Sequence, residues 1–131
     1  MEPFQSPRPK KILIADDDRD SVAILCALLR ILGYEAHGAS DAYETLELAR
    51  QIRPEVMLLD IGIPKVNGYQ IASAIKRDPD LASTRLIAFS GYSTDPDREM
   101  AKEAGFDHYL LKPARKEQLI AAIEGLSYVV S

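Results

Sequence analysis

The sequence predicts an α/β domain in which a parallel sheet is covered by helices on both faces. Short apolar runs alternate along the chain with longer segments whose apolar residues recur at helical spacing. The run Val56–Leu59 is apolar without a break, which is typical of a strand buried on both faces of a parallel sheet. We count five strands alternating with five helices, and this order implies right-handed crossovers between parallel strands.

Length and composition limit the classes of protein to which the chain can belong. It has 131 residues, of which 47% are hydrophobic, and this length predicts one domain. The net charge of −4 argues against direct binding to nucleic acid. No apolar stretch approaches the roughly 18 residues of a membrane span. We expect residues 1–10, which hold three prolines, to be a flexible lead-in to a domain over residues 11–131.

The first quarter of the chain predicts a strand, a helix and a second strand. The apolar run over residues 11–15 is the first strand. Asp18 can cap the helix that follows, and Gly33 is placed to end it in the left-handed conformation. Residues 34–38 are extended but weakly apolar, which favours a strand at the edge of the sheet.

The rest of the chain repeats the alternation. Asp41 and Glu44 have the spacing of a capping box for the second helix, which must end near Arg53 because Pro54 follows. After the central strand we expect a helix capped by Asn67 that ends before Pro79, and then a strand over residues 86–89. The next helix has Pro96 at its first position and ends at Gly105. A strand over residues 109–111 and a helix whose apolar stripe runs from Leu119 to Leu126 complete the chain.

Polar residues follow four of the five predicted strands. They are Asp16 and Asp17, Asp60, the pair Ser90 and Gly91, and Lys112. Because parallel strands end at one edge of the sheet, we expect three carboxylates, a hydroxyl and an ammonium in one crevice. At ~4 Å and an effective dielectric constant near 20, each carboxylate pair costs about 4 kcal/mol, so a cation or a raised pKa must relieve it. Ligation by oxygen atoms alone suits Mg²⁺.

This set of groups suits phosphoryl transfer. The carboxylate of Asp60 can act as a nucleophile and form an aspartyl-phosphate. Lys112 and the metal would neutralise the phosphoryl oxygens, while the Ser90 hydroxyl and the backbone N–H next to Gly91 can donate hydrogen bonds to them.

Over residues 11–128 the sequence resembles the receiver domain of two-component response regulators. The resemblance implies a flavodoxin-like fold with strand order 2-1-3-4-5. It implies that Asp60 is the phosphoacceptor and a ligand of Mg²⁺ or Mn²⁺. Further metal ligands would be Asp17 directly, Asp16 through water, and the carbonyl of Gly62.

The same resemblance assigns a switch and a phosphoryl-binding group. Ser90 and Tyr109 match the family's switch residues. Ser90, Gly91 and Lys112 match the residues that bind the phosphoryl group, and the bond from Lys112 to Pro113 is usually cis in the family.

The function implied is that of a cytoplasmic phosphoacceptor switch in a phosphorelay, not of an enzyme. The phosphoryl donor would be a histidine kinase or a histidine phosphotransfer protein. A downstream protein would bind the surface of the fourth helix, fifth strand and fifth helix, with no direct nucleic-acid or membrane partner. The chain would be a monomer or a weak homodimer, and either a separate receiver or a piece of a larger protein.

Three alternatives remain. A receiver-like interaction module would share the pattern without being phosphorylated. A phosphatase of the haloacid dehalogenase type would need a second aspartate where Gly62 stands, and a flavodoxin would need a phosphate loop where Asp16–Asp18 would repel an anion. We do not expect His37 or His108 to carry a phosphoryl group, and we expect Cys26 in the core.

Overall fold

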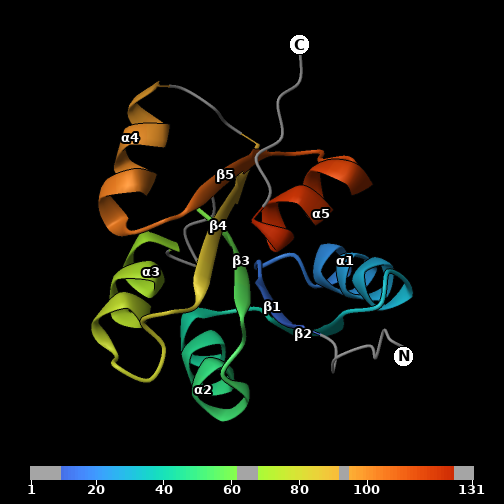
Figure 1. Ribbon diagram of the computed structural model, residues 1–131, viewed down its shortest axis with the longest axis horizontal. Helices are drawn as coiled ribbons and strands as arrows, with labels where there is room; N and C mark the ends of the chain where they lie inside the picture. Colours follow the sequence, from blue (N-terminus) through green and yellow to red (C-terminus); the bar gives the residue numbers. More distant parts are fainter. Residues whose placement is uncertain (1–9, 62–67, 92–94, 126–131) are drawn as a thin grey trace, which may run out of the picture.

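The computed structural model describes residues 10–61, 68–91 and 95–125 (Figure 1). Within them the strands are β1 (Lys11–Ala15), β2 (Glu35–Ala39), β3 (Val56–Asp60), β4 (Arg85–Ser90) and β5 (His108–Leu111). The helices are α1 (Arg19–Ile31), α2 (Ala42–Ile52), α3 (Gly68–Arg77), α4 (Asp95–Ala104) and α5 (Lys116–Glu124). The strands pair in parallel in the order β2-β1-β3-β4-β5, which confirms the predicted topology and the edge position of the second strand.

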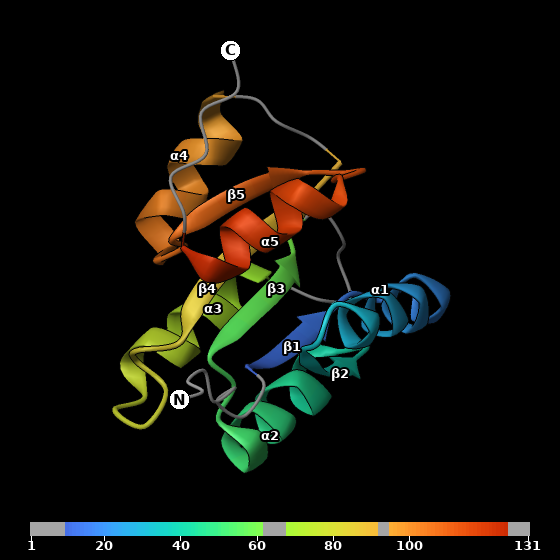
Figure 2. The same cartoon turned by 45° about the vertical axis from the view of Figure 1, so that its right-hand side comes forward.

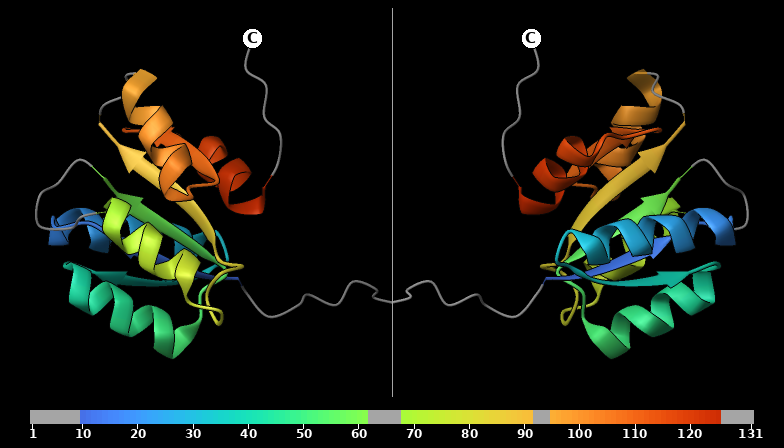
Figure 3. Two further views of the ribbon diagram at one scale, coloured as in Figure 1. Left: turned by 90° about the vertical axis from the view of Figure 1, so that its left-hand side faces the viewer. Right: turned by 90° about the vertical axis from the view of Figure 1, so that its right-hand side faces the viewer.

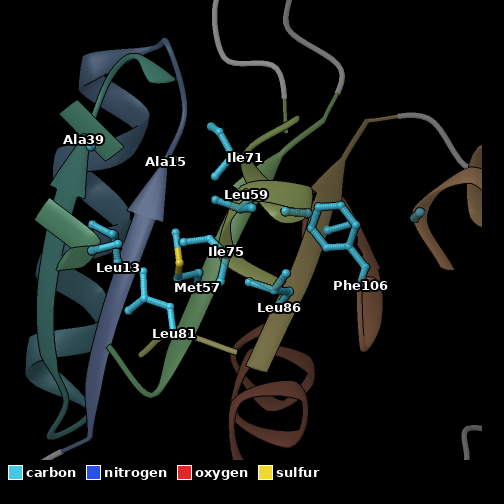
Figure 4. Packing of buried hydrophobic residues seen from close by; sticks show 14 residues of the cluster. Leu13, Ala15, Ala39, Met57, Leu59, Ile71, Ile75, Leu81, Leu86 and Phe106 are labelled. Atoms are coloured by element: carbon cyan, nitrogen blue, oxygen red, sulfur yellow. The ribbon is translucent and has the colours of Figure 1, made fainter. Parts of the chain in front are cut away.

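The helices form a layer on each face of the sheet. Helices α1 and α5 cover one face, and α2, α3 and α4 cover the other (Figures 2 and 3). Each face has its own apolar cluster, and Figure 4 shows the one under α2, α3 and α4, to which Met57, Leu59 and Leu86 contribute from adjacent strands. None of the helices in the described ranges is long and apolar enough to cross a membrane.

Strand β3 lies at the centre of the sheet and all five of its residues are buried. Successive side chains point to opposite faces, so that Leu58 enters the cluster under α1 and α5 while Leu59 enters the other. An unbroken apolar sequence is therefore required. The strand continues one residue further than predicted and ends at Asp60, whose carboxylate is buried with it.

Local sequence signals determine most of the helix ends. Asp18 caps α1 through hydrogen bonds from the backbone N–H groups of Asp20 and Ser21, as predicted. Gly33 and Gly105 adopt positive φ angles of 100° and 104° just after the helices that they end, where side chains are disfavoured.

Two helix starts differ from the prediction. The capping box of α2 is half formed: the Asp41 carboxylate accepts from the Glu44 N–H at 2.7 Å, but the Glu44 carboxylate accepts from Ser40 at 2.8 Å. The backbone before the cap places the N–H of Ser40, and not that of Asp41, within reach of Glu44. Helix α4 begins at Asp95, so that Pro96 is its second residue and not its first; the first turn tolerates Pro there because its N–H groups have no partner within the helix.

Several predictions about the chain ends and loops lie outside the described residues. They are residues 1–9 of the lead-in predicted over residues 1–10, the cap at Asn67 and the end of the apolar stripe at Leu126. The described part of the last helix carries the predicted stripe, since Leu119 and Ile123 are buried.

Helix α1 approaches strand β2 closely because residue 38 has no side chain. A Cβ atom added to Gly38 would lie 2.2 Å from Val22 Cγ1 and 3.4 Å from Cys26 Sγ. Both contacts belong to the buried face of α1, where Val22 and Cys26 are 8% and 4% exposed. The packing of α1 on the edge of the sheet thus requires glycine at position 38 for lack of space, and not for its backbone conformation.

We expect Gly38→Ala to lower the free energy of unfolding by about 1–3 kcal/mol, because the added methyl group forces α1 or β2 to shift. Urea unfolding followed by circular dichroism measures this. Gly91→Ala is the matched control, because a Cβ atom there meets nothing within 4 Å. Equal stability of the two variants would contradict the packing argument.

Glu124 links three segments at the end of α5. Its Oε1 accepts from Lys10 Nζ at 2.9 Å and its Oε2 accepts from the Tyr34 hydroxyl at 2.7 Å. The hydrogen bond from Lys10 is the main cause that lowers the pKa of Glu124 below its ordinary value of 4.5, and the hydrogen bond from Tyr34 is the second. Because the folded-state pKa is the lower one, the resulting stability is present above pH 4.5 and is lost as the pH falls through the folded-state value.

We expect Glu124→Gln to reduce the free energy of unfolding at neutral pH by less than about 1 kcal/mol, since solvent screens this partly exposed group. The difference from the wild type should shrink below pH 4.5. Urea unfolding at a series of pH values measures it, with the exposed Glu103→Gln as control. A difference that is constant with pH would exclude the carboxylate as its source.

Candidate functional site

Three adjacent strands end in polar side chains that are buried. Asp16 directly follows β1, while Asp60 and Ser90 are the last residues of β3 and β4. Their exposed fractions are 6%, 3% and 2%. Since β1, β3 and β4 are neighbours and parallel, the three side chains lie at one edge of the sheet, as the sequence pattern predicted.

Lys112 joins these strand ends. Its Nζ donates to Asp16 Oδ2 at 2.8 Å and to Asp60 Oδ2 at 2.9 Å. Its backbone N–H donates to the carbonyl of Ser90 at 2.7 Å, which places the start of the β5–α5 connection beside the end of β4. The Lys112–Pro113 peptide bond is cis, as expected. Four segments that are far apart in the sequence therefore meet at Lys112, two of them at its ammonium group and one at its backbone N–H.

The three consecutive aspartates after β1 have different surroundings. Asp16 Oδ2 accepts from Lys112, and Asp16 Oδ1 accepts from the backbone N–H of Asp18 at 3.0 Å. Asp17 is half-buried and follows directly. Asp18 is exposed, and the hydroxyl of Ser21 is the main cause that lowers the pKa of this helix-capping carboxylate. Asp18 thus serves the helix, whereas Asp16 faces the crevice.

The electrostatic balance of the crevice is negative. Burial by itself lowers the pKa of Lys112, but the hydrogen bonds and charges of Asp16 and Asp60 outweigh it and raise the pKa above 10.5. The ammonium is therefore charged at neutral pH, and a single positive charge serves two buried carboxylates with Asp17 beside them.

This donor set suits a divalent cation, because an excess of negative oxygen ligands is what Mg²⁺ selects. No three acidic, histidine or cysteine side chains in the described ranges are gathered closely enough to hold a metal ion by themselves. The predicted ligand Gly62 lies outside the described residues. Asp16, Asp17 and Asp60 as metal ligands therefore stay a prediction that the charge balance favours.

Gly91 and Tyr109 are the other predicted site residues that the structure describes. Gly91 is exposed, and a Cβ atom there would meet nothing within 4 Å, so the end of β4 is open to a ligand. Tyr109 is half-buried on the face under α4, and the guanidinium of Arg98 lies 4.9 Å from the centre of its ring. Their roles as a phosphoryl-binding backbone and a switch aromatic stay predictions.

Two contacts of the site were not predicted from the sequence. The Lys112 ammonium lies 5.2 Å from the centre of the Phe89 ring, and Arg98 lies over Tyr109. Phe89 fits the pattern of a strand residue, and Arg98 that of an exposed helix residue. Neither spacing nor composition carries a signal for such contacts between different elements.

An apolar groove opens beside the crevice on the face of α1 and α5. Its volume is about 330 Å³, and it is lined by Leu25 and Leu28 of α1 and by Phe89, Pro113 and Leu119, among others. Asp16 and Lys112 form its polar end. The Lys112 side chain therefore lies between an acidic crevice and an apolar wall.

The two histidines and the cysteine lie away from the end of β3, where Asp60 stands. His37 pairs with Glu35 at 2.8 Å on the edge strand. His108 begins β5, at the opposite edge of the sheet from Asp60, and burial is the main cause that lowers its pKa. Cys26 is 4% exposed in the core, and burial raises the pKa of its thiol.

The sequence is similar to those of known response regulators. The sequence-family model of the response regulator receiver domain matches residues 12–124. The chain is 29% identical over 116 residues to the polar-differentiation response regulator DivK of Brucella anthropi, covering 88% of this chain and 94% of DivK. It spans only about half the length of several other curated relatives that it matches.

Solved structures agree with the fold. The chemotaxis protein CheY4 of Vibrio cholerae superimposes with a TM-score of 0.84 at 23% identity, over 91% of this chain and 99% of CheY4. A response regulator of Burkholderia pseudomallei, with a phosphorylated aspartic acid, a calcium ion and citrate, gives a TM-score of 0.80 at 26% identity, over 87% of this chain and 66% of that one.

We expect Lys112→Met to lower the free energy of unfolding by about 1–3 kcal/mol in the presence of a chelator, because two buried carboxylates lose their shared counter-ion. Added Mg²⁺ should stabilise this variant more than the wild type. Urea unfolding with and without Mg²⁺ measures both effects. The control is Lys116→Met at the exposed start of α5, and equal behaviour of the two variants would remove Lys112 from the electrostatic balance.

Proposed function

The chain belongs to the family of response regulator receiver domains, and on that premise we propose that Asp60 accepts a phosphoryl group and that Lys112 holds it. A receiver domain is a signalling module and not a conventional enzyme, and two-component signalling implies a histidine kinase as partner. The observation that carries the proposal is the ammonium of Lys112 between the buried carboxylates of Asp16 and Asp60.

The transfer is a displacement at phosphorus. An oxygen of the Asp60 carboxylate attacks the phosphorus of a phosphohistidine, and the new O–P bond forms as the P–N bond breaks. The electron pair of the P–N bond goes to the donor imidazole, which takes up a proton from solvent. Water later attacks the same phosphorus, which restores the Asp60 carboxylate and releases phosphate.

The residues around Asp60 stabilise the charge on the transferred group. Lys112 donates a hydrogen bond to a phosphoryl oxygen, and the Ser90 hydroxyl and the backbone N–H at Gly91 donate to others. Asp16, Asp17, Asp60 and the carbonyl of Gly62 would hold Mg²⁺ or Mn²⁺, which supplies further positive charge when bound. The parallel strands fix these donors before the reaction begins.

The phosphoryl group then biases two states of the surface. Ser90 turns toward the phosphoryl oxygens, and Tyr109 moves inward as the space beside it opens. A downstream protein reads the change on the face of α4, β5 and α5. Met100 and Leu111, which are 51% and 46% exposed on α4 and β5, are suited to such an apolar contact. We place this signalling in the cytoplasm, where a kinase or a histidine phosphotransfer protein is available.

We expect Asp60→Asn to abolish phosphorylation, because the amide cannot act as the nucleophile. The protein is incubated with Mg²⁺ and phosphoramidate, a small donor with a P–N bond, and the mass gain of one phosphoryl group is measured. Asp80→Asn, an exposed site between α3 and β4, is the matched control and should be labelled like the wild type. Equal labelling of Asp60→Asn would remove Asp60 from the role of acceptor.

The same measurement separates the alternative function. A receiver-like interaction module that is never phosphorylated would show no mass gain in the wild type at any Mg²⁺ concentration. In that case the charge balance at Asp16 and Asp60 would serve metal binding or folding alone.

A further inference from the structure

We infer that Phe89 is a positioning residue for Lys112, holding the ammonium group at the crevice through the face of its aromatic ring. The ammonium lies 5.2 Å from the centre of the ring, within the range of a cation–π interaction. Phe89 is the residue before Ser90 at the end of β4, and the chemistry proposed above does not use it. The inference rests on the proposed function, since it concerns the residue that binds the phosphoryl group.

Strand β4 holds Lys112 at two points. The carbonyl of Ser90 accepts from the Lys112 N–H at 2.7 Å and so fixes the backbone. The preceding residue, Phe89, points to the opposite face of the strand from the Ser90 side chain, toward α1 and α5. The backbone and the ammonium of Lys112 are thus positioned by neighbouring residues of one strand.

The surroundings of the ring are mostly apolar. Phe89 is half-buried and packs against the apolar cluster under α1 and α5. It lines the apolar groove together with Leu25, Pro113 and Leu119, which leaves little polar surface near the ring. Few polar groups other than the two carboxylates therefore compete with the ring for the ammonium.

The ring interaction differs from the two hydrogen bonds in how it depends on direction. Hydrogen bonds weaken steeply when their angles change, and those from Lys112 to Asp16 and Asp60 must rearrange when Asp60 carries a phosphoryl group. The attraction to the ring face is electrostatic, and it acts on an ammonium over the face within about 6 Å of the ring centre whichever oxygen accepts its hydrogen bonds. Phe89 therefore keeps the ammonium within reach of the crevice while its hydrogen-bond partners change.

The test reduces the electron density on the ring face in steps while the shape of the ring is kept. Phenylalanines with one to three ring fluorines are incorporated at position 89, and the rate of phosphorylation by phosphoramidate with Mg²⁺ is measured. Each added fluorine withdraws electron density from the ring face, so the rate should fall stepwise, to about two- to fivefold below the wild type. Phe89→Tyr should retain the wild-type rate, and Phe89→Leu should show the full loss.

The control is the same series at Phe106, a buried ring in the opposite apolar cluster, which should leave the rate unchanged. A stepwise loss at position 89 alone supports the inference. A wild type that is labelled, with a flat series at position 89, would overturn the inference and leave the proposed function standing. A wild type that is not labelled would overturn both, and unfolding curves for each variant show whether the analogues are folded.

Discussion

One ammonium group between two buried carboxylates is the interaction on which the rest of the site depends. Asp16 and Asp60 come at the ends of paired strands, so they cannot move apart without breaking the sheet. Two such charges are costly in the interior unless a cation and hydrogen bonds accompany them. Lys112 supplies the cation and the hydrogen bonds from a third segment, and so it ties the end of β5 to the centre of the sheet. The negative charge that remains is the physical reason to expect a divalent cation.

The core and the site belong to the same strands. The residues that precede Asp60 are at most 2% exposed, and they fill both faces of the sheet. A carboxylate at the end of such a strand inherits the rigidity of the core, whereas a carboxylate on a loop would not. The close packing of α1 on β2 at Gly38 stabilises the side of the sheet next to Asp16.

Prediction from the sequence succeeded where a short stretch of chain contains the physical cause. The apolar run before Asp60 requires burial on both faces, and Asp18 finds its hydrogen-bond donors within three residues. The capping box at Asp41 was half wrong because its second hydrogen bond depends on how the chain enters the helix. The glycine at position 38 carried no signal, since its cause is a side chain on another element.

The sequence alone determined the alternation of strands and helices, and with it the gathering of Asp16, Asp60, Ser90 and Lys112 at one edge, because parallel strands all end on the same side. Only the tertiary structure decided which of these groups touch, since contact depends on strand order and on the path of the chain after β5. It decided that one lysine serves two aspartates, and that an aromatic ring from the neighbouring strand lies beneath its charge. Such contacts join residues that are distant in the chain, and no local pattern encodes them.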